Sequence, residues 1–232
     1  MFNFTLFFVL IVTNVTAIEL NFVTENAPPL QYIKDGEISG KTTRIIKKVL
    51  EHAQMPAKIS IYPWARAYQK ALNGKNIFIY PLVRTVEREN HFIWIGEILT
   101  LNLSWVKLSH KKNIKISKLE DVKRYKIGVM RGDATHTYLL KHGFEKNKNF
   151  IVVSELPKLL NLLYAEKIDS FIVDLDLLKE MALLKGYDEK KLISALEIPE
   201  LKFTVYLAAN IDTDLVLIDK MKHSLCWVMK CN

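Results

Sequence analysis

The residues "GEILTLNLSWVKLS" (96–109) form one β-rich run that is longer than most strands in a small sheet. A second long β-rich run, "LKFTVYLAA", spans residues 201–209. The chain between these runs reads as an α/β unit, and another α/β unit precedes the first run. The two runs therefore predict strands that carry the chain from one lobe to a second and back, with a cleft between the lobes.

The first α/β unit combines strands that are alternating or continuously apolar with helices of 3.6-residue periodicity. Its expected strands lie at residues 18–24, 57–63 and 76–82. Thr42 and Thr43 are expected to cap the first helix, and Pro63 is expected to open the second. Gly74 is expected to end that helix as a left-handed residue. The β-α-β-α-β order is typical of one half of a doubly wound sheet.

The second α/β unit repeats this order. Its expected strands lie at residues 125–130, 149–154 and 169–174. Helices are expected from Asp133 or Thr135, from Ser154, and over residues 175–187, and a last helix over 212–229 should return to the first lobe. The pattern predicts an α/β fold of two lobes, each a mainly parallel sheet flanked by helices, joined by two hinge strands. Lobe 1 is predicted as residues 18–103 with 206–232, and lobe 2 as the inserted residues 104–205.

The charge pattern argues against a nucleic-acid partner. The 232 residues include 33 Lys and Arg against 25 Asp and Glu, a formal net charge of +8. The lysines are scattered rather than arranged in a stripe, and no nucleic-acid-binding motif occurs. No Cys/His spacing resembles a zinc site, so no metal is expected.

The N-terminal residues "MFNFTLFFVLIVTNVTA" (1–17) have the pattern of a secretory signal with cleavage after about Ala17. They lack the usual basic residue, and a membrane anchor is the alternative interpretation. The apolar run Leu6–Val12 is shorter than the about 20 residues that a span requires. Export to the periplasm is therefore the favoured prediction.

The two cysteines, Cys226 and Cys231, lie five positions apart on the expected last helix. On a continuous helix their side chains would point about 140° apart, so a disulfide needs the helix end to unwind. A buried Cys226 with an exposed Cys231 is the favoured prediction, and a disulfide stays open.

Several motifs in order resemble the bacterial periplasmic solute-binding proteins of the polar amino-acid type (family 3). The motifs are "VTENAPPLQY" (23–32), "YPWARAYQKALNGK" (62–75), "YPLVRTVEREN" (80–90) and "LEDVKRYKIGVMRGDATHTYL" (119–139). The resemblance covers nearly all of the chain after residue 17. It implies a monomeric, non-catalytic clamshell without a cofactor, which closes on a small polar solute for an ABC-type importer.

In that family, an arginine in a Thr-x-x-Arg element holds the ligand's α-carboxylate. Here the element is Thr85-Val86-Glu87-Arg88, which makes Arg88 the candidate. A planar guanidinium suits this role because it forms two parallel hydrogen bonds to a carboxylate. The alternative is a solvated charge cluster of Glu87, Arg88 and Glu89.

The resemblance also places acids at Glu25 and Asp174, where either would receive the ligand's ammonium. Both lie at predicted strand ends, where α/β sheets bind ligands. Asp174 has an alternative role as the cap of the following helix.

Two elements depart from the family pattern. The second lobe's loop reads Gly132-Asp133-Ala134-Thr135, so Asp133 places a negative charge where hydroxyls are usual, beside the hydroxyl of Thr135. The strand before Arg88 offers Tyr80, Pro81 and Val83, where hydroxyl side chains are common in the family. Both departures count against a standard α-amino-acid ligand.

The segment "PWARA" (63–67) resembles a subgroup of the family in which this helix start faces the cleft. Trp64 would stack on a ligand or a cation, and Arg66 would add positive potential. The alternative places Trp64 in the core and Arg66 in solvent.

Two further functions stay open. An acid–base enzyme on the same scaffold, such as a small-acid dehydratase or lyase, requires carboxylates with separated pKa values. A sensory protein would bind solute and contact a membrane receptor instead of a permease.

Overall fold

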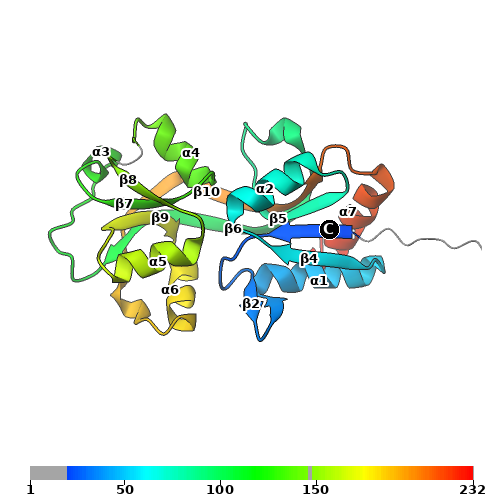
Figure 1. Ribbon diagram of the computed structural model, residues 1–232, viewed down its shortest axis with the longest axis horizontal. Coiled ribbons are helices and arrows are strands. Elements are labelled where there is room, and N and C mark those ends of the chain that lie inside the picture. Colours follow the sequence, from blue (N-terminus) through cyan, green and yellow to red (C-terminus); the bar gives the residue numbers. More distant parts are fainter. Residues whose placement is uncertain (1–19, 146–147, 232) are drawn as a thin grey trace, which may run out of the picture.

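The computed structural model describes residues 20–145 and 148–231, so the predicted signal peptide (1–17) lies outside the described residues. Figure 1 shows two lobes joined by two long strands, β6 (Phe92–Leu108) and β10 (Leu192–Asn210). These strands confirm the α/β fold of two lobes. They extend beyond the two β-rich runs, and the exact lobe boundaries stay a prediction.

The remaining strands belong to one lobe or the other. In lobe 1 they are β1 (Leu20–Thr24), β2 (Tyr32–Lys34), β3 (Glu37–Ser39), β4 (Ala57–Ile61) and β5 (Ile77–Val83). In lobe 2 they are β7 (Ile127–Met130), β8 (Phe150–Val153) and β9 (Ser170–Asp174). β1 pairs in parallel with β4 and β5, and β7 pairs in parallel with β8 and β9.

In the described part of the chain, the two lobes share one eight-stranded sheet in the order β4-β1-β5-β10-β6-β9-β7-β8. The hinge strands β6 and β10 pair with each other along their length, β10 also pairs with β5, and β6 also pairs with β9, all antiparallel. The sequence predicted two mainly parallel sheets, and the antiparallel hinge pair is what unites them.

Helices cover both faces of this sheet (Figure 1). They are α1 (Lys41–Ala53), α2 (Trp64–Asn73) and α7 (Leu215–Met229) in lobe 1, and α3 (Leu119–Val122), α4 (Ala134–Lys141), α5 (Leu156–Tyr164) and α6 (Leu175–Leu184) in lobe 2. Short 3-10 turns, η1 (Glu89–His91) and η2 (Glu189–Lys191), precede the hinge strands. No helix within 20–145 and 148–231 is long and apolar enough to span a bilayer.

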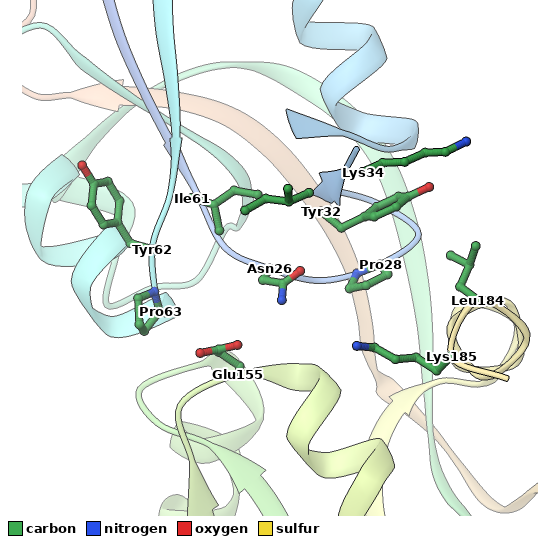
Figure 2. Close-up of a pocket in the computed structure, with 11 residues that line it drawn as sticks. Asn26, Pro28, Tyr32, Lys34, Ile61, Tyr62, Pro63, Glu155, Leu184 and Lys185 are labelled. Atoms are coloured by element: carbon green, nitrogen blue, oxygen red, sulfur yellow. The ribbon is translucent and has the colours of Figure 1, made fainter. Parts of the chain in front are cut away.

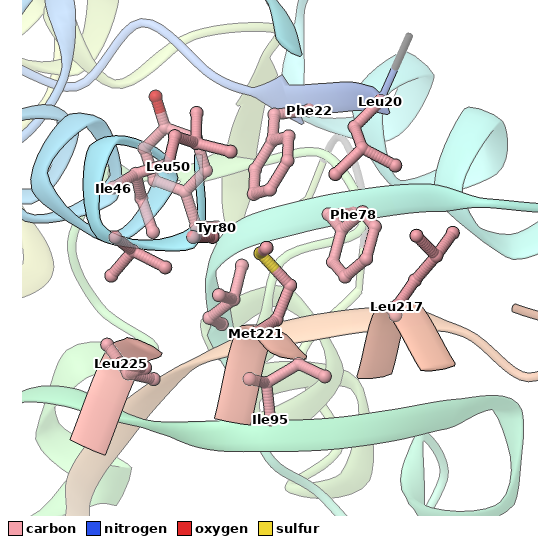
Figure 3. Packing of buried hydrophobic residues seen from close by; sticks show 14 of the residues in the cluster. Leu20, Phe22, Ile46, Leu50, Phe78, Tyr80, Ile95, Leu217, Met221 and Leu225 are labelled. Carbon is pink, nitrogen blue, oxygen red and sulfur yellow. The ribbon is translucent and has the colours of Figure 1, made fainter. Parts of the chain in front are cut away.

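The core of lobe 1 lies between the sheet and helices α1 and α7 (Figure 3). Phe22 and Phe78 stack with ring centroids 4.7 Å apart. Leu217 and Met221 of α7 pack against this pair from the other end of the chain. The C-terminal helix therefore returns to the first lobe, as predicted.

The first helix is capped two residues before Thr42, the first of the two residues predicted to cap it. Gly40, with φ +117°, is the N-cap residue, and a Cβ there would lie 2.2 Å from the Leu30 carbonyl oxygen. Thr42 and Thr43 lie within the helix and are buried. Their hydroxyls bond to Leu30 O at 2.9 Å and to the Tyr80 hydroxyl at 3.2 Å, so they serve tertiary contacts in place of the cap.

Two other local predictions were wrong. Gly74 is extended, with φ −110°, because the chain turns directly toward β5 and leaves no room for a side chain beside Ile77 and Lys70. Cys226 is exposed, because the apolar face of α7 is filled by its leucines, Ile218 and Met221. Both cysteines are free thiols, so the structure has no disulfide between them.

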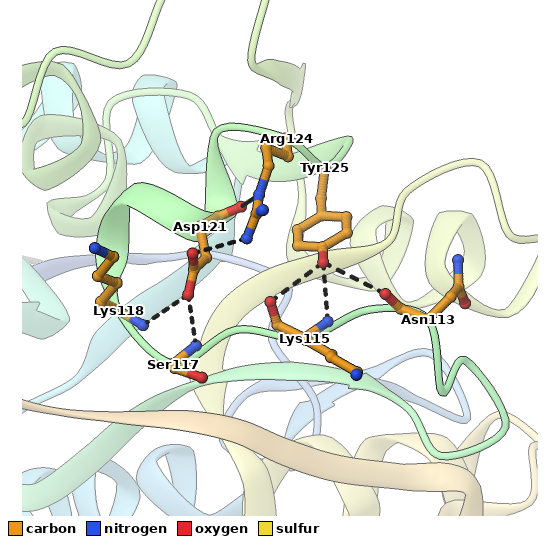
Figure 4. Close-up of polar contacts among 7 residues, drawn as sticks. All are labelled: Asn113, Lys115, Ser117, Lys118, Asp121, Arg124 and Tyr125. Atoms are coloured by element: carbon orange, nitrogen blue, oxygen red, sulfur yellow. Dashed lines mark hydrogen bonds and ion pairs between the residues drawn. The ribbon is translucent and has the colours of Figure 1, made fainter.

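The connection from β6 to β7 is held by side chains of its own sequence (Figure 4). The Asp121 carboxylate accepts hydrogen bonds from the backbone N–H groups of Ser117 and Lys118, at 3.0 and 3.2 Å. The Tyr125 hydroxyl accepts from Lys115 N at 2.9 Å. These bonds satisfy backbone groups that no strand partner reaches, and they fix the entry to β7.

Candidate binding site

A cavity of about 120 Å³ lies between the lobes and is walled by both of them. Four charged side chains line it: Glu25, Arg88, Asp133 and Asp174. Glu25 follows β1, Arg88 follows β5, Asp133 follows β7, and Asp174 ends β9. The carboxyl ends of parallel strands are where α/β folds bind ligands, and here the two lobes bring four such ends to one cavity.

The rest of the wall is largely apolar. The hinge strands contribute Leu101, Leu103, Phe203 and Val205, and lobe 2 adds Met130, Leu156, Ile172, Leu177 and Met181. A low-dielectric wall of this kind strengthens any charge interaction inside it and makes an unpaired charge costly.

Glu25 is the least satisfied carboxyl group in the site. Its Oε2 atom is buried and has no hydrogen-bond partner. Burial and the nearby Asp133 carboxylate raise the pKa of Glu25 to about 8, and the Arg88 guanidinium opposes that rise. The side chain therefore carries a proton near neutral pH when the cavity is closed.

Asp133 is, in contrast, bonded to its own helix. It caps α4 by accepting from His136 N at 2.7 Å and from the Thr135 hydroxyl at 2.9 Å. Burial still raises the pKa of this carboxyl to about 6, although its hydrogen bonds and Arg88 lower it. Thr135 lines the cavity, but its hydroxyl proton is directed at Asp133.

Arg88 is buried, with 6% of its surface exposed, so it is not a solvated charge. Its Nη1 donates to Val83 O at 3.0 Å, and its Nη2 donates to Gly132 O of the other lobe at 3.3 Å. Its guanidinium also lies over the rings of Trp64 and Tyr68, at 5.3 and 5.1 Å. Burial lowers the pKa of Arg88, while Tyr68 and Asp133 oppose that shift.

Asp174 caps α6, the alternative that the sequence left open. Its Oδ1 accepts from Asp176 N and Leu177 N, both at 3.1 Å, and its Oδ2 accepts from Asn102 N of the hinge at 2.9 Å. All of these donors are backbone groups, so the carboxylate is well satisfied without a ligand. Its role toward an ammonium stays a prediction.

The remaining candidates lie in different places. Trp64 lines the cavity, is 4% exposed, and donates from Nε1 to Gly132 O at 2.9 Å. Tyr80 is fully buried in the lobe 1 core, because its side chain faces α1. Arg66 is exposed, and Thr85 is half-buried; neither lines this cavity.

The lobes contact each other around the cavity. Gly132 O accepts from both Trp64 and Arg88 of lobe 1. Lys41 of α1 pairs with Glu180 of α6 at 2.6 Å. Glu87 pairs with Lys141, which lowers the pKa of the Glu87 carboxyl to about 2. The structure is therefore that of a closed clamshell.

A second hollow of about 610 Å³ opens at the outer edge of the interlobe boundary (Figure 2). Asn26, Tyr32 and Pro63 of lobe 1 face Glu155 and Lys185 of lobe 2 across it (Figure 2). Pro28 lines both this outer hollow and the inner cavity. The inner cavity holds the converging charges and is the candidate site.

Two features of the site were not predicted from the sequence. The hinge residues that wall the cavity, such as Leu103 and Phe203, read only as strand residues. Gln31 also lines the cavity, with its Nε2 buried and unpartnered. The polar residue within the apolar loop 27–31 was a signal that could have identified it.

No His, Cys, Asp and Glu cluster in residues 20–145 and 148–231 is arranged to hold a metal ion. Neither protein-family models nor curated proteins match the sequence. Solved structures do match. A histidine kinase sensor domain with similarity to periplasmic binding proteins has a TM-score of 0.80 at 15% identity, covering 92% of this chain and 91% of its own.

Two amino-acid-binding proteins are also similar. The substrate-binding protein AbpA of an amino-acid ABC transporter from Streptococcus pneumoniae, bound to L-arginine, has a TM-score of 0.76 at 15% identity over 91% of this chain and 89% of its own. The arginine-, lysine- and histidine-binding protein ArtJ from Geobacillus stearothermophilus has a TM-score of 0.78 at 16% identity over 91% and 90%. This chain has the periplasmic-binding-protein fold. Identities this low show a shared periplasmic-binding-protein fold only, so the ligand of this chain has to be inferred from its own residues.

Proposed function

We propose that the protein is an exported, non-catalytic solute-binding protein that captures a small polar solute by closing its lobes. The observation that carries this proposal is the interlobe cavity at which charged strand ends from both lobes converge. A ligand that touches both walls favours the closed state by its differential affinity for that state.

The interlobe contacts support closure as the mechanism. Gly132 O receives two hydrogen bonds from lobe 1, and the ion pairs Lys41–Glu180 and Glu87–Lys141 bridge the two lobes. Each of these bonds forms only when the lobes meet. The antiparallel hinge pair, β6 and β10, is the only backbone connection between lobes within the described residues, so bending there opens the cavity.

The partner is a membrane protein of one of two kinds. The similar amino-acid-binding proteins include one named for an ABC transporter, and the similar sensor domain is part of a histidine kinase. A permease with an ATPase, or a membrane-bound sensor, would accordingly read the closed state in the periplasm. The signal-like residues 1–17 support that location.

A thermal-shift screen of the purified protein against amino acids, small carboxylic acids and amines tests the function. A ligand at 100 times its dissociation constant should add about 2.7 kcal/mol to the free energy of unfolding. Small-angle scattering with and without that ligand should show a more compact particle when it is bound. A protein that responds to none of these solutes is not a binding protein for them.

An acid–base enzyme is the second candidate, because one observation favours it. The carboxyls of Glu25 and Asp133 have pKa values of about 8 and about 6 in one closed cavity. Separated values of this kind suit a paired general acid and base. Turnover of a bound solute, followed by NMR over hours, would replace the binding role with this one.

A further inference from the structure

We propose that the cavity takes a protonated amine that carries a small apolar body and a neutral hydrogen-bond acceptor, such as an amino alcohol, and rejects carboxylates. The proposal rests on the solute-binding function and names the chemical class of the solute. It differs from the expectation that Arg88 holds a ligand carboxylate.

The charges on the cavity wall favour a cation. Three carboxyl groups, from Glu25, Asp133 and Asp174, face a single guanidinium, that of Arg88. Arg88 already donates to two backbone carbonyls and lies over two aromatic rings. A ligand carboxylate would add a further acidic group to a wall that already has three carboxyl groups and one cation, whereas an ammonium would reduce the imbalance.

The hydrogen-bond donors on the wall are also largely committed. The Thr135 hydroxyl donates to Asp133, and Trp64 Nε1 donates to Gly132 O. Buried carboxylates in proteins require several donors, or an opposite charge, to offset desolvation. This wall offers a ligand carboxylate too few of them.

Two buried side-chain atoms on the wall have no partner, and they define the ligand's polar groups. Glu25 Oε2 is an acceptor and requires an N–H donor, which selects a primary or secondary ammonium over a quaternary one. Gln31 Nε2 is a donor and requires an acceptor. The apolar side chains of the hinge, Leu103 and Phe203 among them, leave room for a short hydrocarbon body between these groups.

Proton competition gives the proposal a second readout. Because the pKa of Glu25 in the empty, closed cavity is about 8, an ammonium must displace a proton from it near neutral pH. The other charged groups on this wall are Arg88, Asp133 and Asp174, and Asp133 ionises earlier, near pH 6. Amine affinity should therefore rise between pH 6 and 8, by up to about tenfold per unit.

The test uses three probes with one four-carbon skeleton: 2-amino-1-butanol, 2-aminobutanoate and butanoate. Calorimetric titration should show binding of the amino alcohol only, tighter at pH 8 than at pH 6, with release of about one proton at pH 7. Glu25→Gln, which keeps the shape of the side chain, should weaken amino-alcohol binding at least tenfold. Glu155→Gln, an acid of the outer hollow, should leave it within about twofold.

The outcomes separate the two proposals. Binding of 2-aminobutanoate or butanoate as tightly as the amino alcohol would overturn the amine inference and leave the solute-binding function intact. So would amino-alcohol binding that Glu25→Gln does not weaken, or that weakens from pH 6 to pH 8. If none of the three probes binds but an amino acid or a carboxylic acid in the screen does, only the amine inference fails; a protein that binds no solute loses both proposals.

Discussion

The lobe 1 core and the interlobe cavity are both lined largely by apolar side chains, but they differ in whether their buried polar atoms are hydrogen-bonded. In the core, the Tyr80 hydroxyl bonds to Thr43, and the Thr24 hydroxyl bonds to Tyr80 O at 2.5 Å. In the cavity, Glu25 Oε2 and Gln31 Nε2 have no partner. An apolar interior whose polar atoms are all hydrogen-bonded stabilises the fold. An interior with unpaired polar atoms is less stable, and a ligand that pairs with those atoms gains affinity from them.

The largest expected effect tests the core side of this comparison. Phe78→Ala removes the ring that stacks on Phe22 in the fully buried core, and it should lower the free energy of unfolding by about 3–5 kcal/mol. Phe203→Ala removes the same group from the half-buried cavity wall and should cost clearly less. Urea unfolding of both variants measures the difference, and equal losses would show that the cavity wall is packed like the core.

The next largest effect is the pH dependence of the free energy of unfolding that the Glu25 carboxyl causes. In the unfolded chain Glu25 loses its proton near its ordinary pKa of 4.5, but in the folded protein it does so near 8. Because the folded state holds the proton more tightly, the free energy of unfolding should fall as pH rises from 4.5 to 8, by up to about 1.4 kcal/mol per unit. Above pH 8 this contribution is constant.

Glu25→Gln should remove this slope between pH 6 and 8, as measured by urea unfolding at several pH values. Asp133 acts in the same direction but over a lower window, ending near its folded pKa of about 6. The variant should therefore keep a slope below pH 6. An unchanged slope above pH 6 would place the titrating group elsewhere.

A smaller effect compares the two helix caps at the cavity. Asp174→Ala removes a carboxylate that accepts three backbone N–H bonds, and it should cost about 1–2 kcal/mol of unfolding free energy. Asp133→Ala also removes a cap, but it relieves the charge that raises the pKa of Glu25. At pH 8 it should cost less than Asp174→Ala, and a larger loss would mean that Asp133 is a purely structural cap.

The sequence predicted much of this frame for physical reasons that act locally. Apolar periodicity located most of the strands, and the long runs at 96–109 and 201–209 identified the hinge. The resemblance placed Glu25, Arg88 and Asp174 at the strand ends that line the cavity. Strand ends can be predicted because parallel strands of one sheet end at the same edge.

Other features depend on contacts that no local pattern encodes. Tyr80 lies in a continuously apolar strand, where alternation cannot tell the core face from the cleft face. The two bonds to Gly132 O join residues 44 and 68 positions apart, and they depend on how the lobes meet. That Glu25 Oε2 lacks a hydrogen-bond partner likewise becomes evident only once the positions of all neighbouring side chains are known.

The smallest expected effect concerns contacts that close the cavity without lining it. Lys41 and Glu180 pair across the lobes at 2.6 Å, with side chains 46% and 42% exposed. Exposed pairs contribute at most about 1 kcal/mol, so Lys41→Ala should hardly change stability and should weaken ligand binding by no more than a few-fold. Trp64→Phe, which loses the buried bond to Gly132 O, should open the ligand-free protein further, as scattering would record. If Lys41→Ala opened the clamshell more than Trp64→Phe, the exposed ion pair, and not the contacts beside the cavity, would control closure of the lobes.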